Sequence, residues 1–282
     1  MEEHELEAPV LGVSWDGTGY GSDETVWGGE FLKITKHCFD RIGHFRYFSL
    51  PGGEKAVKEP RRVALGLLYE IFNDSLVDID NLAPLKTFSS SEISILTTMI
   101  QKKLNTPLTS SVGRLFDAVS SILGLCQQNT FEGKAAMKLE FAIEELKTEE
   151  SYEYKIIKDT QNQNPSFTVD WAPTIKAILE DLNLKTPVKS ISAKFHNTLI
   201  EIIISMARRV GEEKVVLTGG CFQNKYLLEN AIDRLNSEGF STYWPERIPP
   251  NDGGIALGQI VAASRMINGG IGNVPSSSWK DT

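Results

Sequence analysis

The segment from Glu213 to Pro245 constrains the fold of this chain more than any other. It reads EKVVLTGGCFQNKYLLENAIDRLNSEGFSTYWP, which is an apolar strand, a Gly-Gly turn, a helix and a second strand. This order is the signature of a βαβ unit, in which a helical crossover joins two parallel strands. Strands near the N-terminus and mainly helical sequence over residues 89–146 extend the pattern. The sequence therefore predicts an α/β chain with a mixed sheet.

Composition narrows the class of protein and its surroundings. The 282 residues suffice for one large domain or two lobes, and the net charge of −8 opposes binding to nucleic acid and to anionic membranes. The chain has no run of about 18 apolar residues that could span a membrane. The acidic N-terminus is not a signal peptide, and three cysteines without a CxxC pair suit a reducing cytosol. These features predict a cytoplasmic protein that binds neither nucleic acid nor membrane.

Three glycine-rich turns are the candidate functional segments. They are DGTGYG from Asp16, LTGGCFQN from Leu217 and IPPNDGGIALGQ from Ile248. Asp16 and Asp252 lie at the edges of two of these turns, and paired carboxylates are hard oxygen donors for a divalent cation that in turn neutralises phosphate. The alternatives are structural: Asp16 as a turn residue, and Asp252 as the N-cap of a buried helix that follows from Ile255 to Ala263.

The arrangement of the turns predicts a nucleotide site of a particular kind. Neither GxGxxG nor GxxxxGK[ST] occurs, which argues against a Rossmann dehydrogenase and a P-loop NTPase. A nucleotide held between the Gly turns of two lobes, with carboxylates on a metal, is the pattern of the actin, hexokinase and Hsp70 class. We therefore expect a domain over residues 1–265, with a first lobe over about 1–110, a second over about 111–265, and a polar tail over 266–282.

Seven motifs in a fixed order carry a family resemblance over nearly the whole chain. They are VLGVSWDGTGYGSDETVWGGEF, SLPGGEKAVKEPRRVAL, SSVGRLFDAVSSILGL, FEGKAAMKLE, FHNTL, LTGGCFQNKYLLE and PPNDGGIALGQ. Together they resemble the C-terminal carbamoyltransferase domain of HypF-type [NiFe]-hydrogenase maturation proteins. That domain is similar to tRNA threonylcarbamoyl transferases and antibiotic O-carbamoyltransferases. The resemblance implies two RNase H-like lobes, of which the first is N-terminally incomplete here.

The resemblance also implies a reaction and its partners. Carbamoyl phosphate and ATP give carbamoyl-adenylate in upstream modules, and this domain passes the carbamoyl group to the C-terminal cysteine thiol of a HypE-type acceptor protein. The thiocarbamate then becomes the precursor of a cyanide ligand. Because the attacking thiol comes from the partner, the chain needs to supply Lewis-acid polarisation and positioning rather than a nucleophile.

The residue roles below are what the resemblance implies. Asp16 and Asp252 look like the catalytic carboxylates that ligate a divalent metal, which is iron, zinc or magnesium. Contacts to ATP or carbamoyl-adenylate are implied for Gly17, Thr18, Asp117, Gly133, Gly219, Gly220 and Asn224. Gly17 and Thr18 would contact the carbamoyl-phosphate end, and Asp117 the ribose. His196, in FHNTL, matches its motif without an assigned role.

One departure from the family pattern bears on activity. The family has an HxxxH pair upstream of DGTGYG that completes the metal site, whereas here only His4 stands in that region. Two carboxylates alone bind iron or zinc poorly and magnesium weakly. We therefore expect the chain to be inactive alone, and its lost first strands to leave an open sheet edge that favours a homodimer. A catalytically incomplete nucleotide-binding or partner-docking module and a tRNA threonylcarbamoyl transferase relative are the alternatives.

Three further residues have competing interpretations. Asp117 stands three positions after Arg114 on a helix, so a surface ion pair is the structural alternative to a nucleotide contact. His196 lies on an apolar helix and suits an interior histidine as well as a functional one. Cys221 follows the Gly pair, where a buried thiol is a better expectation than a nucleophile.

Overall fold

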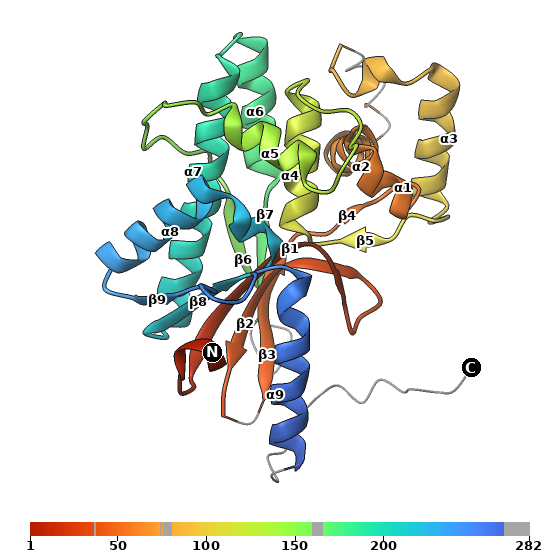
Figure 1. The fold of residues 1–282 in the computed structure, drawn as a ribbon. Helices are drawn as coiled ribbons and strands as arrows, with labels where there is room; N and C mark the ends of the chain where they lie inside the picture. The colour runs from red at the N-terminus through yellow and green to blue at the C-terminus, as the bar shows by residue number, and fades with distance from the viewer. Residues whose placement is uncertain (37, 74, 76–80, 160–165, 268–282) are drawn as a thin grey trace, which may run out of the picture.

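The computed structural model describes residues 1–36, 38–73, 75, 81–159 and 166–267. Its centre is a nine-stranded mixed sheet with the order β6-β7-β3-β2-β1-β8-β9, and β4 and β5 pair beside this path (Figure 1). The strands are β1 (Val10–Tyr20), β2 (Val26–Ile34), β3 (Phe39–Phe45), β4 (Phe48–Ser49), β5 (Leu108–Thr109), β6 (Lys155–Asp159), β7 (Ser166–Asp170), β8 (Lys214–Thr218) and β9 (Ser241–Tyr243). The predicted α/β class with a mixed sheet is confirmed.

The first glycine-rich segment is a strand and not a turn. β1 continues through DGTGYG to Tyr20 and pairs antiparallel with β2, and the register shifts between Trp15 and Gly19. The turn lies after it, where the Gly21 N–H donates to the Thr25 carbonyl over 3.0 Å. β1 and β2 therefore form a hairpin, but the glycines of DGTGYG permit an irregular stretch within β1 instead of a reversal.

The predicted βαβ unit is confirmed. β8 and β9 are parallel, and α8 (Lys225–Ser237) connects them after the short 3-10 helix η4 (Gly220–Gln223). β8 also pairs parallel with β1, whereas β1 pairs antiparallel with β2 on its other side. β1 is thus an inner strand, and among the described residues the sheet ends at β6 and β9. The pairing of β1 on both sides does not test the expected open sheet edge or the homodimer through it, and both stay predictions.

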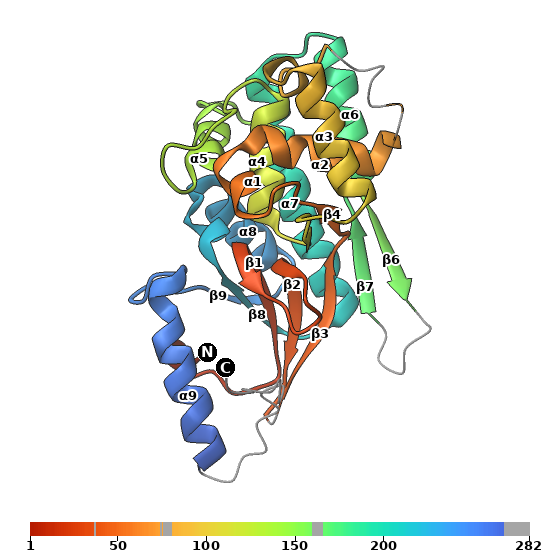
Figure 2. The same cartoon turned by 90° about the vertical axis from the view of Figure 1, so that its right-hand side faces the viewer.

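Most helices gather at one end of the sheet, and the long helix α7 runs down beside the strands (Figures 1 and 2). These helices are α1 (Glu54–Lys58), α2 (Pro60–Phe72), α3 (Ser90–Gln101), α4 (Val112–Ile122), α5 (Lys134–Phe141), α6 (Ala172–Asn183) and α7 (Val188–Val210). Helix α4 is almost wholly buried, and the Ser111 hydroxyl caps it by accepting the N–H of Arg114 over 3.1 Å. Serine suits this position because its side-chain oxygen satisfies a backbone N–H that the first turn of a helix leaves free.

The aromatic core anchors the strand that carries Asp16. Trp15 is fully buried and packs edge-on against Phe31 and Phe45, with ring centroids 5.9 and 5.4 Å apart. Its other partner, Phe222 of η4, stacks at 5.7 Å. Three segments that are distant in sequence thus meet at the residue before Asp16, and this packing fixes the position of that carboxylate.

Helix α9 (Ile255–Ile267) differs from its prediction. Its apolar side chains are largely exposed, including Ile255 at 53% and Ile260 at 66%. Figure 2 shows the helix standing apart from the other helices. The expectation of a buried helix was wrong because apolar composition indicates what a helix can bury, not which surface covers it. None of the helices in the described chain combines the length and apolar content needed to cross a membrane.

The predicted division near residue 110 remains a prediction. The central sheet contains strands from both sides of that position, since β8 and β9 extend the sheet that β1 to β3 begin. Residues 266 and 267 belong to α9, and the rest of the predicted tail lies outside the described residues.

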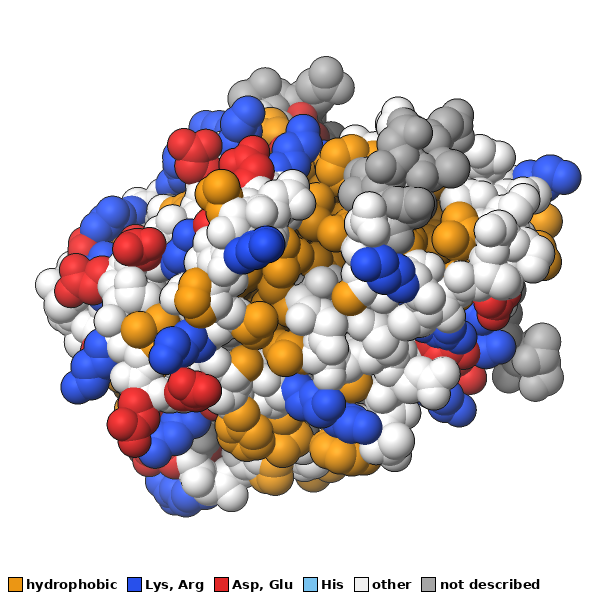
Figure 3. All heavy atoms as spheres, turned by 90° about the horizontal axis from the view of Figure 1, so that it is seen from above, with side chains coloured by type: hydrophobic (Ala, Val, Ile, Leu, Met, Phe, Trp, Pro, Cys, Tyr) orange, Lys and Arg blue, Asp and Glu red, His pale blue; other side chains and the backbone are white. Residues whose placement is uncertain are grey.

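Figure 3 shows the molecule from its helical end, where acidic and basic side chains alternate around a hydrophobic centre.

Candidate functional site

One cavity collects most of the residues that the sequence selects. Its volume is about 650 Å³, and its lining includes seven of the nine predicted site residues. These are Asp16, Gly17, Asp117, Gly133, Gly220, Asn224 and Asp252. The other two, Thr18 and Gly219, line a second cavity of about 590 Å³. Asp16, Asn251 and Asp252 line both cavities, so these three residues lie where the two meet. We call the first the carboxylate cavity and the second the α9 cavity.

Backbone donors hold Asp16 where the two cavities meet. The Gly17 N–H donates to its Oδ1 atom over 2.7 Å. Burial raises the pKa of the Asp16 carboxyl, and the charges of Asp252 and Glu132 act in the same direction. Hydrogen bonds from the backbone of Gly17 and Gly220 oppose this increase in pKa. A nearby cation would relieve the repulsion among these carboxylates.

Two glycines allow the backbone segments around Asp16 to approach closely. A Cβ atom on Gly113 of α4 would lie 2.7 Å from the Cα atom of Gly17, which is closer than side chains pack. Gly219 has a φ of 101°, and its added Cβ atom would collide with the Trp15 carbonyl. Glycine is therefore required at both positions if β1, β8 and α4 are to converge here.

Asp252 does not cap the helix that follows it. The Asn251 side chain performs the capping, because its Oδ1 atom accepts the Gly253 N–H over 3.1 Å. Asp252 begins the 3-10 helix η5 (Asp252–Gly254), and its side chain is exposed between the two cavities. The structural alternative for Asp252 was thus wrong, and the carboxylate is left available for a ligand.

Asp117 forms a buried ion pair with Arg114. The Arg114 Nη1 and Asp117 Oδ2 atoms are 3.1 Å apart, and the two residues are 6% and 1% exposed. Burial raises the pKa of the Asp117 carboxyl, whereas the Arg114 charge and a hydrogen bond from Asn129 lower it. The alternative of an ion pair is correct in its partners, but the pair is buried and faces the cavity rather than solvent.

Asn224 and His196 form a second buried polar pair. The Asn224 Oδ1 atom caps α8 by accepting the Leu227 N–H over 2.8 Å. His196 is fully buried in α7, and desolvation lowers its pKa to about 4, so its ring is neutral. The interior position expected for His196 is confirmed, and its contact with Asn224 links it to the carboxylate cavity.

Sequence reasoning missed several cavity residues. They are Glu132, Ala136, Met137, Glu140, Phe141, Gln223, Lys225 and Asn251. Glu132 stands directly before Gly133 and Asn251 before Asp252, so both could have been selected from the motifs themselves. Glu140 accepts the N–H of Lys225 over 2.8 Å, which joins α5 to the start of α8. No sequence signal distinguishes Met137 and Phe141 from ordinary core residues of α5.

Burial disfavours Cys221 as a nucleophile. Cys221 lines the cavity, but desolvation raises the pKa of its thiol well above the ordinary value, and the Asp16 charge adds to the increase. A thiol that stays protonated is a poor nucleophile and a poor metal ligand. The chemistry of the cavity thus rests on its carboxylates and on Arg114.

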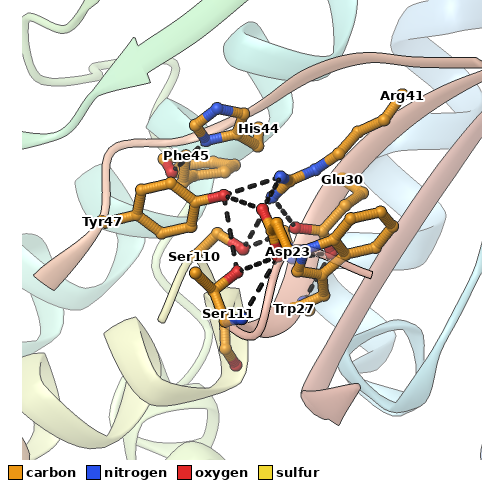
Figure 4. A network of polar contacts seen from close by, with 12 residues as sticks. Asp23, Trp27, Glu30, Arg41, His44, Phe45, Tyr47, Ser110 and Ser111 are labelled. Atoms are coloured by element: carbon orange, nitrogen blue, oxygen red, sulfur yellow. Dashed lines mark hydrogen bonds and ion pairs between the residues drawn. The ribbon is translucent and has the colours of Figure 1, made fainter. Parts of the chain in front are cut away.

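A polar network supports β2 behind the α9 cavity (Figure 4). Glu30 is 2% exposed, and its carboxylate accepts N–H groups of Gly28 and Gly29 over 2.5 and 2.7 Å. It also binds the Arg41 Nη2 atom at 2.9 Å and the Ser110 hydroxyl at 2.5 Å. Arg41 extends the network to Asp23 and Tyr47. These bonds satisfy a carboxylate that would otherwise be costly to bury.

The donor set limits which metal fits the carboxylate cavity. Within the described residues, no cluster of three or more His, Cys, Asp or Glu side chains has the arrangement needed to hold a metal ion. A structural zinc site requires four protein ligands and a catalytic one three. Magnesium instead uses one or two carboxylates together with water and phosphate oxygens. Asp16 and Asp252 therefore fit magnesium brought with a phosphate better than a preformed iron or zinc centre.

Comparison with known proteins decides the family. Residues 12–259 match the family model described as carbamoyltransferase, Kae1-like domain, second subdomain. The chain belongs to the HypF carbamoyltransferase family. The family predicted from the seven motifs is thus confirmed, and it covers most of the chain.

Individual HypF proteins show how much of the family this chain spans. Carbamoyltransferase HypF of Synechocystis sp. is 44% identical over 275 residues, which cover 93% of this chain and 35% of that protein. A crystal structure of full-length HypF in the phosphate- and nucleotide-bound form matches with a TM-score of 0.85 and 38% identity, over 95% of this chain and 41% of that one. HypF of T. kodakarensis matches with a TM-score of 0.81 and 26% identity, over 95% and 35%. The chain spans about a third of the Synechocystis protein.

The likeness to HypF structures also confirms the fold class. The Kae1-like domain is an actin/hexokinase-like α/β fold, and both HypF structures superpose over 95% of the chain. The glycine-rich segments that predicted this class from sequence are the ones that converge on the carboxylate cavity.

Proposed function

We propose that this chain transfers a carbamoyl group from carbamoyl-adenylate to the C-terminal cysteine thiol of a HypE-type acceptor, during synthesis of the cyanide ligands of [NiFe]-hydrogenase. The observation that carries the proposal is the convergence of seven motif residues on one cavity of about 650 Å³ in a HypF-family chain. A cavity of this size accommodates a nucleotide. The related HypF structure in a nucleotide-bound form supports such a ligand.

The lining of the carboxylate cavity suits an adenylate in one orientation. Ala136, Met137 and Phe141 give it an apolar wall on α5, and Phe141 is 67% exposed. Asp16 and Asp252 lie where the carboxylate cavity meets the α9 cavity. We place the adenine base against α5 and the phosphoryl and carbamoyl groups near the two aspartates. Asp117, Gly133, Gly220 and Asn224 then contact the nucleoside, and Gly17 and Thr18 the carbamoyl end.

The charge of the cavity argues for a cation beside the donor. Five carboxylates line it against two cations, Arg114 and Lys225. Such a cavity repels a bare phosphate unless a cation intervenes. Asp16 and Asp252 would hold magnesium together with the phosphate, and the metal would supply Lewis-acid polarisation of the donor oxygens.

The chain's own residues position the donor and do not enter the covalent chemistry. The acceptor sulfur forms a bond to the carbamoyl carbon, the bond from that carbon to the phosphate oxygen breaks, and AMP leaves with the electron pair. The thiol proton passes to solvent. AMP is a good leaving group, so orientation and charge stabilisation supply the rate. The raised pKa of Cys221 agrees with an attacking thiol that comes from the partner.

Labelled carbamoyl transfer tests the proposal. The chain is assayed alone and joined to the upstream part of the Synechocystis relative, with carbamoyl phosphate, ATP and a HypE acceptor. We expect the joined form to label the acceptor cysteine and the chain alone not to do so. The Asp16→Asn, Asp252→Asn double variant of the joined form should lose the labelling. Undiminished labelling by that double variant would contradict the proposal.

A further inference from the structure

Arg114 has more hydrogen-bonding capacity than the chain uses. Arg114 is 6% exposed. Its Nε and Nη1 atoms are buried and make no hydrogen bond with any described residue. Nη1 faces the Asp117 Oδ2 atom at 3.1 Å as an ion pair, without the alignment of a hydrogen bond. A buried guanidinium left in this state is costly, so its unused donors call for a partner.

The position of Arg114 indicates what that partner is. Its Nη2 atom lies 3.0 Å from where a Cβ atom of Gly17 would stand, so the guanidinium lies beside the segment that follows Asp16. Arg114 and Gly113 both line the carboxylate cavity, in the first turn of α4. The N-terminus of an 11-residue helix adds positive potential at the same place. A planar cation beside a helix N-terminus favours an anion with several oxygens.

We infer that Arg114 is the anion-binding residue of the carboxylate cavity and contacts the phosphoryl group of the adenylate. This inference rests on the proposed nucleotide site and adds a residue to which neither the motifs nor the family comparison assigns a role. Asp117 is then a positioning residue, since its ion pair with Nη1 holds the guanidinium with Nη2 beside Gly17, toward the ligand. Arginine suits the position because its rigid fork matches phosphate geometry, which a lysine ammonium does not.

Comparison of AMP binding with adenosine binding isolates the contact between Arg114 and the phosphoryl group. The two ligands share the base and ribose and differ in the phosphoryl group, so the ratio of their dissociation constants reports recognition of the anion. Both are titrated calorimetrically into the purified chain in magnesium buffer. Arg114→Met should reduce the preference for AMP by roughly 10- to 100-fold and leave adenosine binding unchanged, as expected for loss of a charge-assisted hydrogen bond. Arg114→Lys should restore part of the preference.

Two further variants control for folding and for general charge. Arg114→Met leaves Asp117 buried without its ion-pair partner, so the double variant Arg114→Met, Asp117→Asn removes both charges together and should show the same loss of preference. Lys189→Met removes a cation outside the cavity, whose side chain is 48% exposed, and should leave the preference unchanged.

The outcomes separate the inference from the proposed function. An unchanged preference for AMP in the Arg114→Met and double variants, or an equal loss for AMP and adenosine, would overturn the role of Arg114 and leave the nucleotide site standing. Failure of the folded wild-type chain to bind either ligand would overturn both.

Discussion

The Nε2 atom of His196 lies 2.9 Å from the side-chain amide nitrogen of Asn224, in the interior between α7 and the start of α8. The direction of this bond follows from the other ring nitrogen. Nδ1 lies 2.8 Å from the Ser192 carbonyl, which can only accept, so Nδ1 carries the proton and Nε2 accepts from Asn224. Asn224 therefore has its amide oriented by a neutral histidine while its oxygen caps α8.

This pairing predicts that two substitutions of His196 differ in their effects on stability and on AMP binding. His196→Gln can retain an acceptor toward Asn224, whereas His196→Asn retains the donor toward Ser192 and loses that acceptor. Because an unpaired buried amide costs about 1–3 kcal/mol, we expect His196→Asn to destabilise the chain more and to weaken AMP binding roughly tenfold. Urea denaturation and calorimetry measure the two effects. Equal AMP affinity in both variants would show that His196 does not position Asn224.

His196 also predicts how stability depends on pH. Its pKa is about 4 in the folded chain because of burial, below the ordinary histidine value of 6.5. The unfolded chain therefore binds the extra proton between these values, and the stabilisation present above pH 6.5 is lost as the pH falls toward 4. Between pH 7 and pH 5 this group should lower the free energy of unfolding by about 2 kcal/mol.

Denaturation midpoints of the wild type and His196→Gln across this range measure the effect. Other groups that titrate are common to both proteins, so the difference between the two slopes isolates His196. If the two proteins lose the same free energy on acidification, the histidine is not the source of the pH dependence.

The network around Glu30, which lies opposite Ser14 in the pairing of β2 with β1, predicts an effect on stability. Glu30→Gln places an NH₂ group against Arg41 or against backbone N–H donors, and breaking a buried ion pair costs about 3–5 kcal/mol. Glu30→Gln should therefore cause a large decrease in the free energy of unfolding, measured by urea denaturation. Lys33→Met is the matched control, because it breaks an ion pair with Glu212 in which the lysine side chain is 41% exposed. That change should stay within about 1 kcal/mol. Similar losses in the two variants would contradict the importance of burial here.

Local patterns predicted the elements that depend on local physics. The βαβ unit around Gly219 was predictable because apolar periodicity and a Gly turn specify strand, helix and strand within one short segment. The helix of Arg114 and its Ser111 cap were predictable for the same reason. The course of β1 through Gly17 was not, because a strand with irregular pairing and a turn use the same glycines.

The remaining features depend on tertiary contacts that spacing does not specify. The i, i+3 spacing of Arg114 and Asp117 predicts that they meet, but only the packing of α4 shows that they are buried. The exposed face of α9 has the same explanation, since an apolar sequence does not specify which surface covers it. Motifs selected the polar residues of the carboxylate cavity, whereas its apolar wall at Phe141 carries no signal until α5 is placed.

The two aspartates at the junction of the cavities predict that magnesium decides how their substitution changes the affinity for ATP. In magnesium, Asp16→Asn and Asp252→Asn should each weaken ATP binding roughly tenfold or more, because each removes a charged ligand of the metal. In EDTA the same variants should bind ATP at least as well as the wild type, since each removes one of five carboxylates that repel the phosphates. Asp233→Asn, at an exposed position of α8, controls for the loss of one negative charge from the chain. Calorimetric titration in both buffers supplies the comparison. A loss of equal size with and without magnesium would mean that the aspartates shape the cavity but hold no metal.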